Sequence, residues 1–68
     1  MIARWHYAVV RRTRGGERFV TDYDTETKPR KGRFLNLGSY GVFKVVDRED
    51  PTLKGDRRDI GILYVEEI

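Results

Sequence analysis

Apolar and aromatic residues fall in five short runs along the chain, and turn-forming residues separate them. The runs cover residues 5–12, 18–23, 33–37, 42–47 and 60–65. Each has the length and the β-branched and aromatic content of a strand. No window of about 11 residues sustains the i, i+3, i+4, i+7 spacing of an amphipathic helix. The pattern therefore predicts an all-β protein built from five strands.

The first two runs are separated by a signal for a tight hairpin. Gly15 and Gly16 are adjacent, and such a pair favours a two-residue turn because glycine tolerates positive φ. A loop of these two residues would place Arg12 opposite Phe19. Neither face of the resulting hairpin is cleanly polar, whereas a sheet with one wet face alternates better. Either strong coiling buries parts of both faces, or one face is a binding surface.

The other connections differ in length. Residues 24–32 are polar and contain Pro29, which predicts a mobile loop, and residues 38–41 predict a tight turn. Residues 48–59 form a second long loop, in which Pro51 should end the preceding strand because proline cannot donate to a sheet. The last run is apolar at both alternating sets of positions. It predicts a strand that is covered on both sides, or one whose bend changes its face.

Five short strands in so short a chain indicate one strongly bent antiparallel barrel, a single domain over residues 1–68. An SH3-like barrel fits the strand spacing. An OB-like barrel is the alternative, but that fold usually carries a helix between its third and fourth strands. Only four residues separate those strands here, so the SH3-like barrel is favoured.

Size and composition limit the classes of function. A domain near this size buries only about 60% of its unfolded surface, so its core is thin and a deep substrate pocket is not expected. Cysteine is absent, which excludes a disulfide scaffold and thiolate metal sites. No unbroken apolar run exceeds four residues, whereas a membrane span needs about 20. We expect a cytoplasmic protein with no membrane partner.

Charge is distributed unevenly along the chain. Fourteen Lys and Arg residues against 11 Asp and Glu give a net charge of +3. Residues 1–35 carry +5 and residues 36–68 carry −2. Such asymmetry suggests that part of the surface faces an acidic partner. The alternative is a mixed, solvated surface.

Basic clusters near aromatic residues are the most informative chemical feature. One cluster surrounds the first hairpin turn, and the other lies in the polar loop that contains Pro29. Cationic side chains bind nucleic acid by neutralising phosphates and releasing counterions, and aromatic rings stack on bases. The candidate nucleic-acid-binding residues are Arg11, Arg12, Arg14, Arg18, Lys28, Arg30, Lys31, Arg33, Trp5, Tyr7 and Tyr40.

Catalysis finds little support in the sequence. Ser39 and His6 are the only serine and histidine, and they share no motif of a catalytic triad. No glycine-rich phosphate-binding loop and no metal-ligand spacing occurs. The paired carboxylates fall in loops or near the chain end, where solubility and local ion pairs explain them more simply than acid–base catalysis. We expect no enzyme, no catalytic residues, no metal, no cofactor and no small-molecule substrate.

Two functions remain. The first is a noncatalytic nucleic-acid-binding module that contacts phosphates of RNA or DNA through the basic hairpin tip and loop. The alternative is a protein-interaction module, a homodimer, or a small regulatory or assembly subunit of the kind that mobile elements encode. Its contact surface would be the hairpin face with Trp5, Tyr7, Val9 and Val20, or an exposed sheet edge. Basic clusters that converge beside exposed aromatics favour nucleic acid, whereas clusters neutralised by carboxylates favour a protein partner.

Overall fold

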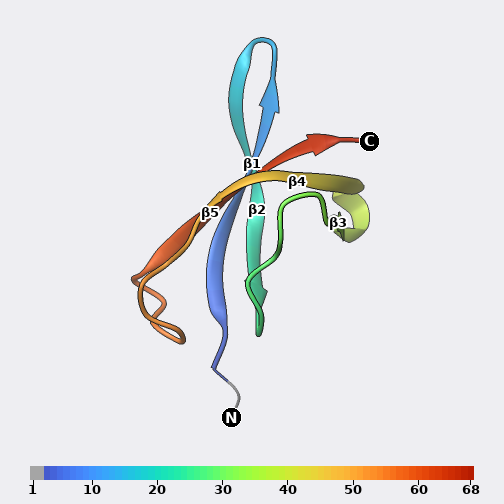
Figure 1. Ribbon diagram of the computed structural model, residues 1–68. Helices are drawn as coiled ribbons and strands as arrows, with labels where there is room; N and C mark the ends of the chain where they lie inside the picture. Colours follow the sequence, from blue (N-terminus) through green and yellow to red (C-terminus); the bar gives the residue numbers. More distant parts are fainter. Residues whose placement is uncertain (1–2) are drawn as a thin grey trace.

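The computed structural model describes residues 3–68 and folds them almost entirely into strands and loops (Figure 1). One short 3-10 turn, η1 (Gly38–Tyr40), occupies the predicted turn between the third and fourth strands. The strands are β1 (Trp5–Thr13), β2 (Gly16–Thr25), β3 (Phe34–Asn36), β4 (Val42–Glu49) and β5 (Ile60–Glu67). The prediction of an all-β chain with five strands is confirmed. Within residues 3–68, no helix has the length and apolar character needed to cross a bilayer.

All five strands belong to one sheet, in the order β2-β1-β5-β4-β3, which curls into a half-barrel. This agrees with the predicted small barrel, with one correction. The pairs β1–β2, β3–β4 and β4–β5 are antiparallel, but β1 and β5 are parallel, so the barrel is not antiparallel throughout. Parallel pairing requires a long crossover between the two strands. Here the three intervening strands supply it.

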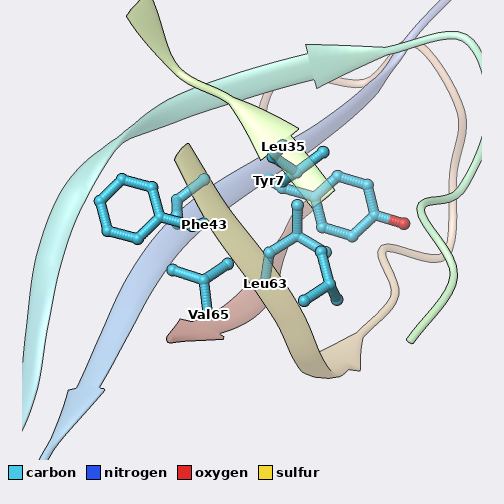
Figure 2. Packing of buried hydrophobic residues seen from close by; sticks show 7 residues of the cluster. Tyr7, Leu35, Phe43, Leu63 and Val65 are labelled. Atoms are coloured by element: carbon cyan, nitrogen blue, oxygen red, sulfur yellow. The ribbon is translucent and has the colours of Figure 1, made fainter. Parts of the chain in front are cut away.

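The core lies on the inner, concave face of the sheet. Alternate residues of β1, β4 and β5 point inward, and Leu35 of β3 joins them. Figure 2 shows these side chains meeting between the strands. The buried apolar residues are Tyr7, Val9, Leu35, Phe43, Val45, Leu63 and Val65. Because side chains alternate along a strand, residues between these positions point to the outer, convex face.

The hairpin register differs from the prediction. The loop is Arg14-Gly15, closed by the pair Thr13–Gly16, so Arg12 pairs with Glu17 and not with Phe19. A β-bulge then leaves Val20 without a partner, between the pairs Val10–Phe19 and Val9–Thr21. The bulge changes which residues share a face. Val20 consequently packs against the core, while the exposed Phe19 lies on the outer face with Val10.

The end of the β1–β2 hairpin projects from the rest of the sheet, and we call residues 11–19 the arm. Figure 1 shows it extending beyond the point where β4 crosses the hairpin. Pairing of β1 with β5 stops at Arg11, so beyond this residue β1 has only β2 as a neighbour. The arm contributes to the long dimension of the molecule, 37 Å against 20 Å in the other two directions.

Candidate interaction surfaces

The arm carries four of the predicted binding arginines, and two of them form ion pairs with carboxylates of the same chain. Arg11 forms an ion pair with Glu67 at the end of β5. The Arg12 guanidinium contacts Glu17 at 3.2 Å and Asp47 at 3.8 Å. Within residues 3–68, neither Arg14 nor Arg18 has a carboxylate within ion-pair distance, and both are exposed. The free positive charge of the arm is thus that of these two residues.

The second predicted cluster lies in residues 26–33, the segment between β2 and β3, which we call the strap. The segment is a loop, as the sequence predicts, and its backbone is hydrogen-bonded to β4. The backbone carbonyl of the buried Pro29 accepts a hydrogen bond from Arg48, and Gly32 N donates to Val45 O at 2.7 Å. These contacts join the strap to β4 next to the β3–β4 pair. The strap therefore has a structural role, which its polar sequence did not indicate.

Ion pairs to β4 and to the residue after it also use part of the strap's charge. Lys31 Nζ lies 3.4 Å from the Asp47 carboxylate, and Lys28 Nζ lies 3.9 Å from that of Asp50. Arg30 and Arg33 are exposed, and no carboxylate of the described chain pairs with them. Half of the strap's four cations are therefore neutralised, as in the arm.

The three aromatic residues among the predicted nucleic-acid contacts do not form one surface. Tyr7 is 1% exposed and belongs to the core, so its ring offers no face to a base. Trp5 is partly buried, with Lys28 Nζ 4.5 Å and Lys54 Nζ 5.9 Å from its ring centre. Only Tyr40, on η1, is largely exposed. The aromatic hairpin face proposed from the sequence as a protein contact is likewise the inner face, and is mostly buried.

The Tyr7 hydroxyl instead takes part in a polar network below the core. It donates a hydrogen bond of 2.8 Å to Asp50, whose carboxylate also lies 3.1 Å from Arg48 Nε. Burial is the main cause that raises the pKa of Tyr7 above its ordinary value, and the bond to Asp50 adds to it. Since Lys28 contacts the same carboxylate, this network joins β1, β4 and the strap.

An apolar stripe runs over the outer face of β1 and β5, with Phe19 of β2 at its border. Register places Val10 between Phe19 and Tyr64, Ala8 beside Ile62, and His6 beside Ile60. Phe19 and Ile60 are more than half exposed, and the others are partly buried. We define the outer stripe as Ala8, Val10, Phe19, Ile60, Ile62 and Tyr64.

Carboxylates flank the outer stripe on both sides. On β2, Asp22 pairs with Ala8 and Asp24 pairs with His6, while on β4 Glu49 pairs with Ile62 and Asp47 with Tyr64. Glu17 extends the flank on β2, and Glu66 on β5 lies beyond Tyr64 at the end of the stripe. The outer strand positions thus carry six carboxylates and two cations, Arg12 and Lys44, although the whole chain has a net charge of +3. The outer face has the opposite sign to the molecule.

Within residues 3–68, the two flanking carboxylates of the middle row have no cationic partner. The row runs Asp22, Ala8, Ile62, Glu49 across four strands. Neither acid forms an ion pair within the described chain, and Glu49 accepts a hydrogen bond of 2.8 Å from the Tyr64 hydroxyl. This bond is the main cause that raises the pKa of Tyr64. Both carboxylates remain available to an external cation.

A polar contact marks each end of the stripe. At the arm end, the Arg12 guanidinium lies 4.2 Å above the centre of the Tyr64 ring, a cation–π arrangement. At the opposite end, His6 Nδ1 lies 2.7 Å from Asp24. A shallow hollow beside this pair is also lined by Asp22, Arg57 and Ile60. The apolar surface is therefore bounded on all sides by polar groups.

The sequence did contain a signal for this surface. The last run of the chain is apolar at both alternating sets of positions, and one of the two sets, with Ile60, Ile62 and Tyr64, turns out to be the outer one. Asp22 and Glu49 gave no such signal, because only strand register brings them to one row. Among residues 3–68, no group of three or more His, Cys, Asp or Glu side chains is arranged to hold a metal ion.

Comparison with known proteins adds no assignment: the chain matches no family model, no curated protein and no solved structure at a significant level.

Proposed function

We propose that the protein is a noncatalytic protein-interaction module that binds its partner through the outer stripe. The observation that carries this proposal is the row Asp22, Ala8, Ile62, Glu49, in which exposed carboxylates flank apolar side chains on an uncovered sheet face. An apolar centre with a polar rim is the usual composition of a protein interface. Contiguous exposed apolar surface on a small domain also favours a partner.

The neutralised basic clusters support a protein partner over a nucleic acid. Arg11, Arg12, Lys28 and Lys31 each face a carboxylate of the same chain. A phosphate would have to displace these carboxylates. Binding would then release fewer counterions than it would if all eight predicted cations were free. The acids that flank the outer stripe would repel a polyanion. They suit a partner that presents apolar side chains together with Lys or Arg.

Site-specific photo-crosslinking in the cells that encode the protein tests this proposal. The crosslinker p-benzoylphenylalanine replaces either Phe19, on the stripe, or Tyr40, on η1, and these two aromatics are similarly exposed at 62% and 56%. We expect discrete protein adducts from position 19 only, and their loss when Ile62→Ser is added. Equal adducts from both positions, or none from position 19, would overturn the proposal.

Nucleic-acid binding through the arm is the second candidate. Arg14 and Arg18 favour it, because both are exposed on a projecting hairpin and lack a carboxylate partner in the described chain. Fluorescence anisotropy against mixed-sequence RNA and DNA at two salt concentrations tests it. Binding that weakens with salt and is lost in Arg14→Gln/Arg18→Gln supports this candidate. Absence of binding at about 50 mM salt, where phosphate contacts are strong, eliminates it.

A further inference from the structure

We propose that the partner presents a basic amphipathic α-helix, which lies along β1 and β5 on the outer stripe. This inference rests on the proposed function and specifies the partner's chemistry. It depends on three properties of the outer face: the width of the apolar stripe between its carboxylates, its length along the strands, and the sign of the charge on both flanks.

The width between the flanking carboxylates fits one helix. Asp22 on β2 and Glu49 on β4 stand in the same row, separated by β1 and β5. Three strand spacings of about 4.8 Å place their backbones roughly 14 Å apart. An α-helix with its side chains is about 10–12 Å across. A helix therefore covers Ala8 and Ile62 and brings its flanks over the two acids.

The length of the stripe fits two to three helical turns. Ile60 and Tyr64 mark its ends on β5, four residues apart. At about 3.3 Å per residue, the stripe extends roughly 13 Å along the strand. A helix rises about 1.5 Å per residue, so about nine residues span this length. Such a segment supplies apolar anchors at i, i+3 or i+4, and i+7 on its face toward the sheet.

The charges on both flanks determine the polar side chains of the helix. Asp22 on one side and Glu49 on the other have no ion pair within the described chain. Lys and Arg can cover apolar surface with their stems while their charged ends reach outward. A helix with Lys or Arg on both borders of its apolar face therefore pairs with both acids at once.

A second copy of this chain fits the outer stripe less well. In a symmetric dimer the same patch contacts itself, which would bring six carboxylates and two cations against an identical set. Pairing of two β2 edges meets the same difficulty. An antiparallel register centred on Tyr23 sets Asp22 opposite Asp24 of the second copy, and like charges directly opposite destabilise a strand pair.

Binding of a model peptide to the full chain tests the inference. The probe is an 18-residue helix with Leu on one face and Lys on both borders, compared with a scrambled peptide of the same composition. Isothermal titration calorimetry at low and moderate salt measures the dissociation constants. We expect the scrambled peptide to bind at least tenfold more weakly, because it cannot present one continuous apolar face.

Matched variants separate binding on the stripe from general attraction. Ile60→Ser changes the stripe, whereas Leu53→Ser alters a loop residue of similar exposure, 58% against 54%. Asp22→Asn and Glu26→Gln each remove one exposed charge, the first beside the stripe and the second on the strap. We expect Ile60→Ser to weaken binding about tenfold, as loss of one buried apolar anchor implies. Asp22→Asn should weaken it severalfold at low salt, and the two controls should leave it unchanged.

Each other result contradicts the inference. If both peptides bind equally, or if stripe and control variants have equal effects, the proposal of a helical partner is rejected. Self-association in sedimentation that Ile60→Ser abolishes assigns the stripe to a second copy. Photo-crosslinks from position 19 without peptide binding would leave the protein interface standing and reject the helix alone. Absence of both would reject the proposed function as well.

Discussion

The inner and outer faces of this sheet are built from neighbouring residues of the same strands, yet they differ in how far their apolar side chains are buried. Leu63 on β5 is fully buried among the core residues, while Ile62 beside it points to the outer stripe and is only partly buried. The strap and β3 are hydrogen-bonded to β4, and Leu35 of β3 packs into the core on the inner face. On the outer face, Phe19 and Ile60 are more than half exposed in the described part of the chain. Apolar residues at alternating strand positions thus form two faces, and only the inner face holds the core of the domain.

The contrast also appears in how each face uses a tyrosine. Tyr7 on the inner face and Tyr64 on the outer face each donate a hydrogen bond of 2.8 Å to a carboxylate, Asp50 and Glu49 respectively. The first bond joins the core to the strap's polar network. The second leaves one tyrosine ring on the surface under Arg12. The same kind of hydrogen bond, from a tyrosine hydroxyl to a carboxylate, joins structural elements on the inner face and lies at the border of the outer stripe on the other face.

Truncation of adjacent residues on β5 gives the largest expected effect. Leu63→Ala removes a fully buried side chain from a thin core and should destabilise the protein by about 2–5 kcal/mol. Ile62→Ala, on the outer stripe, should cost about 1 kcal/mol or less because less apolar surface is lost. Urea unfolding measures both changes. Similar losses for the two variants would mean that the two faces contribute equally to the free energy of unfolding, which would contradict the comparison.

A glycine on the inner side of β5 provides the next test. A Cβ on Gly61 would lie 2.4 Å from the Glu49 carbonyl oxygen and 2.5 Å from Pro51 Cδ, whereas one on Gly15 would meet nothing closer than 3.9 Å. We expect Gly61→Ala to destabilise the fold by about 1–3 kcal/mol, through strain in a packed region. Gly15→Ala in the arm is the control. Thermal melts that show no difference between these variants would contradict the packing at this site.

Alkaline unfolding compares the two tyrosines. The pKa of Tyr7 is raised in the folded state, so the folded protein retains that proton more strongly than the unfolded chain. Its contribution is complete below about pH 10 and is lost as pH rises toward the folded pKa. Tyr7→Phe should therefore reduce the loss of stability between pH 8 and 11, and by more than Tyr64→Phe does. An alkaline profile identical to that of the unchanged protein would contradict the assignment.

The smallest effect on stability is expected for the most exposed residue of the outer stripe. Phe19→Ser should change the free energy of unfolding by about 0.5 kcal/mol or less, because Phe19 is mostly solvated on the arm. The same change should weaken partner binding. Phe34→Ser on β3 is a control with nearly equal exposure. A large loss of stability in Phe19→Ser alone would place this ring in the fold's own packing.

Strand positions were largely predictable from sequence, because apolar runs and turn residues both mark them. All five predicted strands exist, and Pro51 does follow the end of β4. The parallel pair and the hairpin register were not predictable in this way. The observed register has Arg14-Gly15 as the loop and a bulge at Val20, which packs against the core, and a contact with distant residues cannot be inferred from the Gly15-Gly16 pair. The docking of Pro29 under Arg48 likewise depends on a distant strand.

Candidate sites were less predictable than strands, for a physical reason. A cluster of arginines in sequence says nothing of the carboxylates that will lie beside it, and Arg12 meets Asp47 only because β4 and β5 bring it there. Asp22 and Glu49 are far apart along the chain and share a row through two intervening strands. The ambiguous faces of the first hairpin and of the last run did indicate that a second apolar surface was possible.

Hydroxyl-radical footprinting inside cells and on the purified protein tests the central claim most directly, since it compares side chains of matched exposure. Phe19 and Ile60 lie on the outer stripe, while Phe34, Tyr40 and Leu53 lie elsewhere, and all five are between 54% and 62% exposed. We predict that oxidation of Phe19 and Ile60 falls in cells while the other three are unchanged. Unaltered oxidation of both stripe residues, or protection of the other three alone, would contradict the assignment of the outer stripe as a protein interface.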